Sequence, residues 1–195
     1  MDNKQLERTA YHEAGHAVMA WLCGLSVSEA EIGESGDRRG HITHEKCTEA
    51  IKSALIYAAG IAAEALFEKP HGQQQGYGFV GDWLEVRALD KQIPAALKQE
   101  LYSRLPDGVW FADLTADEIM LYAYLNTAGG ALSHHRREIE DLALALIEQG
   151  KIEDVSFWLG FRSPHGGRLA MPPRKSKSRK MPPSKVIDWL TRPIA

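Results

Sequence analysis

The sequence predicts a mainly α-helical domain that carries a small β-hairpin or sheet. Apolar residues recur at helical spacing over long stretches, most clearly in residues 48–68. Two short segments, residues 25–32 and 40–44, instead read as strands, and the turn-forming residues 33–37 join them. The 195 residues are enough for one domain with a sizeable core.

The first expected helix spans residues 5–23 and ends at Gly24, a residue that commonly stops helices. It is apolar nearly all round, which predicts that it is buried. It also contains the sequence His12-Glu13-Ala14-Gly15-His16. Polar residues on a buried helix need polar partners or a metal ion.

The His-Glu-x-x-His spacing indicates a zinc site. Positions four apart lie on one face of a helix, so His12 and His16 can bind one ion side by side. Glu13 follows His12 by about 100° around the helix, near enough to hold a water bound to that ion. Such a site, with one zinc ion per chain, is typical of a hydrolase. The alternatives are two core histidines satisfied by hydrogen bonds, or a site that has lost its metal.

The predicted second strand, residues 40–44, has a specific use beside a zinc site. Its free edge can form hydrogen bonds with an extended peptide, which makes His41, Ile42 and Thr43 candidate substrate-binding residues. An ordinary hairpin that covers the core is the alternative, and both can hold.

The amphipathic helix at residues 48–68 stops before Pro70, and its many alanines allow close approach of the zinc helix. We expect a loop at residues 71–81, so that Asp82 lies at or near the start of the next helix. Asp82 is then an N-cap or a third zinc ligand. Glu64, near the core-facing edge of its helix, is the rival ligand, or it orients a zinc-binding histidine through a hydrogen bond.

Further helices are expected towards the C-terminus. Thr115 and Glu118 form a capping-box sequence that opens a helix towards Asn126, and residues 128–130 break the pattern. Another helix is expected over residues 131–148, closed by Gly150, followed by a short element at residues 152–161. The pair at residues 134–135, His-His, is given no metal role.

Composition and charge set the broad class. The chain is 44% hydrophobic and 25% charged, no apolar run approaches membrane-spanning length, and no signal-peptide core is visible. The two cysteines form no Cys-x-x-Cys pair, so we expect reduced thiols and a cytoplasmic location. There is also no phosphate-binding loop of the ATPase type.

A change in composition divides the chain. Residues 1–163 hold 15 basic and 25 acidic side chains and form the expected domain. Residues 164–185 hold seven basic and no acidic side chains and read as a flexible Pro/Ser-rich linker, and residues 186–195 form a short apolar segment. The basic run is expected to be a solvated tail; contact with nucleic acid or an acidic surface is the alternative.

Several motifs together resemble the peptidase domain of the FtsH-type ATP-dependent metalloproteases. The resemblance covers roughly residues 8–150. Residues 10–18 are similar to the zinc-site helix of that family, residues 40–43 and 59–67 follow in the same order, and residues 81–88 look like its segment with a ligating Asp. The resemblance implies a helical zinc-peptidase fold, His12, His16 and Asp82 as ligands, and Glu13 as general base.

The sequence departs from this family in ways that affect function. The membrane helices and the ATPase module of the family are absent, and Gly60-Ile61 stands where the family has Gly-Arg. The implied activity is hydrolysis of exposed or unfolded polypeptides, unless a separate ATPase or adaptor protein delivers the substrate. The alternative is a non-catalytic scaffold that keeps zinc for stability and binds a partner through its basic tail. The oligomeric state is left open.

Overall fold

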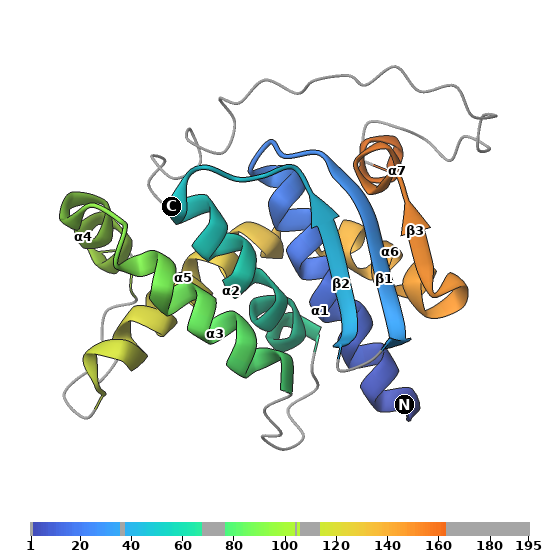
Figure 1. Cartoon of the computed structure of the whole chain (residues 1–195), viewed down its shortest axis with the longest axis horizontal. Coiled ribbons are helices and arrows are strands. Elements are labelled where there is room, and N and C mark those ends of the chain that lie inside the picture. Colours follow the sequence, from blue (N-terminus) through green and yellow to red (C-terminus); the bar gives the residue numbers. More distant parts are fainter. Residues whose placement is uncertain (1, 36–37, 68–76, 104, 106–113, 163–195) are drawn as a thin grey trace.

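The computed structural model describes residues 2–35, 38–67, 77–103, 105 and 114–162. Within this part the chain is mainly helical with one small three-stranded sheet, which confirms the predicted fold class. The expected linker 164–185 and apolar segment 186–195 lie outside the described residues, and so does most of the expected loop 71–81. Figure 1 shows the sheet lying across one central helix, with the other helices around it.

The central helix is α1, Asn3–Leu22, which begins two residues earlier than predicted. The side chain of Asp2 caps it by accepting a hydrogen bond from the backbone N–H of Gln5 at 2.8 Å. Gly24, with a φ of 81°, follows the C-terminal end. Every residue from 12 to 20 is buried, as the all-round apolar pattern predicts, and α1 packs against α2, α6, β1 and β2.

Helix α2, Ala50–Phe67, lies unusually close to α1. A Cβ atom added to Gly15 would lie 2.5 Å from the carbonyl oxygen of Ala59 and 2.5 Å from the Cβ of Ala63. The two backbones therefore touch at a position where only glycine fits. The expectation that α2 is the neighbour of the zinc helix is confirmed.

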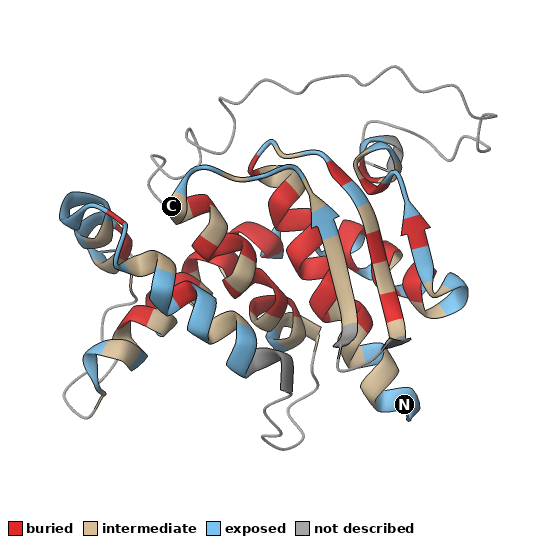
Figure 2. Ribbon diagram, viewed as in Figure 1, coloured by how far each residue is buried: buried red, intermediate tan, exposed pale blue. Residues whose placement is uncertain are grey.

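By length and composition alone, α2 could also cross a membrane, contrary to the expectation that no apolar run approaches that length. Half of its apolar window is buried within the protein, and it packs against α1, α3 and α5. Figure 2 shows the buried residues concentrated along α1 and α2, as in the core of a globular fold.

The sheet contains β1 (Val27–Ser35), β2 (Arg38–His44) and β3 (Lys151–Glu153) in the order β2-β1-β3, with antiparallel pairing. Both predicted strands are present; the third was not predicted, because three residues are too few for a clear alternation. Ala30 lies between Ile42 and Ile152 on the core side. β2 is an outer strand, so one of its edges carries no further strand among the described residues.

Helix α3, Tyr77–Asp90, begins before the expected end of the loop. Asp82 therefore lies in the second turn of the helix, and the N-cap alternative is wrong. Two glycines in the sequence weaken the helical signal there, but packing against α2 and full burial of Val86 outweigh this local preference. Helix α4, Ala95–Ser103, was not predicted.

Helix α5, Ala116–Ser133, starts with the predicted capping box, in which Thr115 and Glu118 satisfy each other's backbone N–H groups. The expected break at residues 128–130 is wrong, because the helix continues through both glycines. Its buried residues at this end pack it on α2 and keep it helical. The chain turns at residues 134–135 instead, and α6 spans Arg136–Gln149.

Gly150, with a φ of 74°, ends α6 as predicted. The short element expected after it is in fact two, β3 and then α7, Val155–Arg162. Val155 and Leu159 are completely buried and fix α7 to the core. The C-terminal part of the described chain thus closes the far edge of the sheet.

Candidate metal centre

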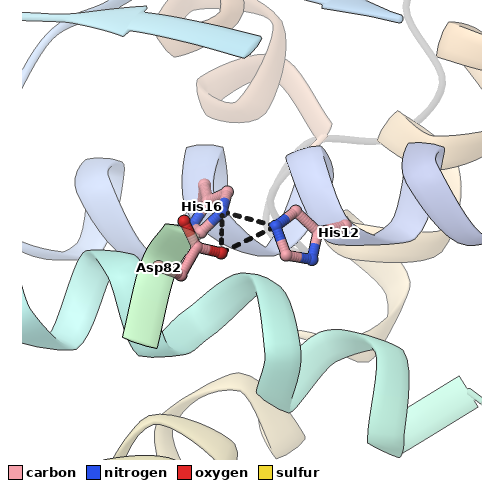
Figure 3. Close-up of side chains that lie close together, drawn as sticks. All are labelled: His12, His16 and Asp82. Carbon is pink, nitrogen blue, oxygen red and sulfur yellow. Dashed lines mark hydrogen bonds and ion pairs between the residues drawn. The ribbon is translucent and has the colours of Figure 1, made fainter. Parts of the chain in front are cut away.

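Three side chains from two helices meet beside the core (Figure 3). His12 and His16 come from one face of α1, and Asp82 comes from α3. Oδ2 of Asp82 lies 2.9 Å from Nε2 of His12 and 3.2 Å from Nε2 of His16, and the two Nε2 atoms are 2.9 Å apart. All three predicted ligands are therefore brought together.

The size of this triangle suits a small divalent cation. A tetrahedral zinc ion with nitrogen and oxygen ligands at about 2.0–2.1 Å holds them roughly 3.3 Å from one another. The observed separations of 2.9–3.2 Å are close to that value. Figure 3 shows the two Nε2 atoms and the carboxylate of Asp82 turned toward one another, with the imidazole planes nearly perpendicular at 87°.

The hydrogen bond made by Nδ1 of each imidazole ring determines the tautomer of that ring. Nδ1 of His16 lies 2.6 Å from the backbone carbonyl oxygen of Ile56, which can only accept a hydrogen bond, so this nitrogen carries the proton. Nδ1 of His12 lies 2.6 Å from Oε1 of Glu64 and donates to that carboxylate. In the neutral form, both rings therefore present the Nε2 lone pair to Asp82.

Three acceptor atoms at this distance repel one another unless a positive charge lies among them. Oδ2 of Asp82 is buried and has no hydrogen bond of normal geometry. A proton is one solution: burial lowers the pKa of His12, but hydrogen bonds to Asp82 and Glu64 outweigh burial and raise it to about 10. Burial opposes ionisation of Asp82, yet the two histidines hold its pKa below the usual range. A divalent cation is the other solution, and this donor set fits zinc.

Glu13 lies beside the triangle and against β2. It is 7% exposed, and burial raises the pKa of its carboxyl group. A Cβ atom added to Gly40 would lie 2.6 Å from Oε1 of Glu13. The backbone of β2 thus passes directly over this carboxylate, which places the open edge strand next to the site.

Gly60 forms the support beneath the imidazoles. A Cβ atom at this position of α2 would lie 2.5 Å from Nε2 of His16 and 2.7 Å from Cε1 of His12. The rings therefore rest on bare helix backbone. The sequence contained a signal for this, since Gly inside a strongly helical pattern is unfavourable without a packing reason.

The remaining predicted residues take different places. Glu64 is not a member of the triangle; it contacts the far side of the His12 ring, which agrees with the orienting role and not with the rival ligand role. His41, Ile42 and Thr43 lie on β2, and Ile42 packs against the core. Nε2 of His41 lies 3.3 Å from Oε1 of Glu29. Sequence reasoning missed Arg8, whose Nε donates to Oε2 of Glu64.

A second group, formed by Glu29, Glu31 and His41, lies on the outer face of the sheet. All three are partly exposed, and Nζ of Lys151 is 2.7 Å from Glu29 and 4.0 Å from Glu31. The lysine ammonium already supplies the positive charge that these carboxylates require, so the group is an ordinary surface charge network.

Comparison with known proteins adds no assignment: no family model matches the chain, and no curated protein matches it.

Proposed function

We propose that this protein is a zinc-dependent metallopeptidase that hydrolyses peptide bonds in exposed or unfolded polypeptides. The observation that supports the proposal best is the convergence of three lone-pair atoms, from His12, His16 and Asp82, beside the buried carboxylate of Glu13. Because Nδ1 of each ring already has an acceptor, the two Nε2 atoms and Oδ2 of Asp82 need a proton or a cation among them, and this donor set fits zinc.

In the proposed mechanism, His12, His16 and Asp82 would hold one zinc ion, which would supply Lewis-acid polarisation of the scissile carbonyl and of a water molecule. Glu13 would accept a proton from the attacking water. It would then return that proton to the amide nitrogen as the C–N bond breaks, so that the amine leaves neutral. Burial raises the pKa of Glu13, which suits a group that must both take and return a proton.

The substrate is proposed to bind as an additional strand on the outer edge of β2. Gly40 brings this strand into contact with Glu13, so a peptide paired near residues 41–43 would run past the metal. Backbone hydrogen bonds of this kind read an extended chain without strict side-chain preference. Folded proteins do not offer such a segment, and a separate ATPase or adaptor would then be needed to deliver them.

This activity agrees with the resemblance to the FtsH-type peptidase domain, and membership of that family is part of the proposal. The expected order of motifs and the ligand set from α1 and α3 support it. The alternative, a non-catalytic scaffold, would also bind zinc but would not hydrolyse peptide bonds.

The test combines metal content and proteolysis on the same samples. We expect one zinc per chain and chelator-sensitive cleavage of an unfolded casein substrate by the parent protein. Asp82→Ala should lose the metal, whereas Glu13→Gln should keep it and lose about 10²–10⁴-fold in rate. Glu85→Gln, which changes an exposed carboxylate one turn along α3, is the matched control and should behave as the parent.

Two results would count against the proposal. A parent protein that binds zinc but cleaves nothing, even with unfolded substrate, would favour the scaffold. A parent protein that takes up no zinc would return His12 and His16 to the role of core polar residues.

A further inference from the structure

The two histidines of the centre are oriented by different kinds of partner. Nδ1 of His16 donates to a backbone carbonyl, that of Ile56, whose position is fixed by helix α2. Nδ1 of His12 donates instead to the side chain of Glu64, 2.6 Å away. A glutamate has three side-chain torsions and holds a ring in place only if it is itself held.

Arg8 provides that restraint. It lies one turn before His12 on the same face of α1, and its Nε donates to Oε2 of Glu64 while Oε1 of the same carboxylate accepts from His12. Each carboxylate oxygen of Glu64 thus contacts a different residue of α1. The side chain of Glu64 is only 10% exposed and that of Arg8 26%, so solvent screens this pair less than a surface ion pair.

We propose that Arg8 is a positioning residue of the metal centre, acting through Glu64 on the orientation of His12. The inference rests on the proposed function, since it assumes that the centre binds zinc. It concerns a residue outside the His-Glu-x-x-His motif, which touches neither the metal nor the substrate.

Charge gives a second reason for an arginine at this position. Glu13, Glu64 and Asp82 place three carboxylates, each at most 15% exposed, around one dication. Arg8 supplies the third positive charge and leaves the group balanced. An excess buried charge is costly, so the loss of Arg8 would favour rearrangement of Glu64.

The expected effects of substitutions on zinc affinity follow from the series of contacts from Arg8 to Glu64 to His12. Loss of a carboxylate behind a metal-binding histidine typically weakens metal affinity about 10–100-fold. We expect a loss in this range for Glu64→Gln and about tenfold for Arg8→Met, because Glu64 remains but is no longer fixed. Arg8→Lys retains the charge without the planar Nε–H donor and should recover part of the loss.

The experiment measures Zn²⁺ affinity by competition with a chromogenic chelator, and the visible absorption bands of the Co²⁺-loaded protein, which report ligand geometry. The variants are Arg8→Met, Arg8→Lys, Glu64→Gln and the double variant Arg8→Met/Glu64→Gln. Arg87→Met, which removes an exposed arginine paired with Asp117, is the control for general charge loss. Thermal unfolding of the metal-free proteins checks that each variant folds.

If Arg8 acts through Glu64, the double variant should bind zinc no more weakly than Glu64→Gln alone, and Arg8→Met should shift the cobalt bands. Additive losses, or an Arg8→Met protein with the affinity and cobalt spectrum of Arg87→Met, would overturn the inference. That outcome leaves the peptidase proposal intact if the parent binds zinc and cleaves casein. A parent without zinc overturns both, whereas a zinc-binding parent without cleavage contradicts the peptidase alone.

Discussion

The carboxylate of Glu13 lies against the α-carbon of Gly40, so that a Cβ atom at residue 40 would be 2.6 Å from Oε1. This contact joins the helix that carries two of the proposed metal ligands to the strand proposed to bind substrate. In the proposed catalytic site the backbone of the strand would thus lie directly beside Glu13.

Gly40→Ala should therefore reduce proteolysis while sparing the metal. The added methyl group must displace Glu13 or β2, and a displacement of about 1 Å in a catalytic group can cost roughly 100-fold in rate. Casein cleavage and zinc content, measured together, check this. Gly160→Ala on α7, where an added Cβ meets nothing within 4 Å, should leave both unchanged. Full activity in Gly40→Ala would show that Glu13 does not act from this position.

Gly60→Ala should reduce metal binding itself. Its Cβ would lie 2.5 Å from Nε2 of His16, so the ring must move away from the ion or α2 must move away from α1. Overpacking of this kind also destabilises a fold by about 1–3 kcal/mol. Zinc titration and chemical denaturation of the variant test both effects.

Gly81→Ala is the matched helical control for that experiment. It is next to Asp82 in α3, and an added Cβ there meets nothing within 4 Å. The change should stabilise the protein by about 0.5–1 kcal/mol, as alanine does in helices, without loss of zinc. Equal zinc affinity in Gly60→Ala and Gly81→Ala would contradict the role given to Gly60.

Zinc affinity should depend on pH because the ion must replace a proton. In the metal-free protein the pKa of His12 is raised to about 10, so the ring is protonated below that pH. Apparent affinity should then fall about tenfold for each pH unit below 10, with release of about one proton per zinc bound near neutral pH. Calorimetric titration in buffers of different ionisation enthalpy measures this release. An affinity that is constant from pH 7 to 9 would contradict the prediction.

Alkaline stability should depend on Tyr124. Burial raises the pKa of this phenol, and Asp90, 3.0 Å from its oxygen, raises it further. The unfolded chain loses this proton near pH 10 and the folded protein later, so the free energy of unfolding should fall above pH 10, by up to about 1.4 kcal/mol per pH unit. The contribution is complete below pH 10.

Denaturation at several pH values between 8 and 11.5 would measure that slope. Tyr124→Phe should show a shallower decline than the parent, since it has one phenol fewer to titrate. Identical slopes in the parent and Tyr124→Phe would show that this phenol ionises equally in both states.

The sequence predicted the local and periodic features well. The burial of α1 follows from its apolar pattern, the cap of α5 from Thr115 and Glu118, and the end of α6 from Gly150. The meeting of His12 and His16 follows from helical spacing alone. These features depend on residues close together in the chain.

The features that sequence reasoning missed depend on contacts between distant residues. Helix α5 runs through two glycines because its neighbours in space bury it, and α3 starts early because it packs on α2. Asp82 was a candidate ligand from its expected place near a helix start, but its choice over Glu64 rested mainly on the family resemblance. Arg8 acquires its role from Glu64, 56 positions away, which no local pattern reveals. A glycine inside a helical pattern signals close packing at Gly60, but not that His12 and His16 are its neighbours.

The close contact at Gly15, where α1 and α2 touch backbone to backbone, ties the proposed zinc site to the packing of the core. Two of the three proposed ligands, His12 and His16, lie on α1 and the third, Asp82, lies on α3. The unfolded chain therefore has no comparable site, and zinc bound as proposed would stabilise the folded protein against unfolding. Free zinc at 100 times its dissociation constant would add about 2.7 kcal/mol. Under the zinc proposal, the free energy of unfolding would rise and fall with the concentration of free zinc.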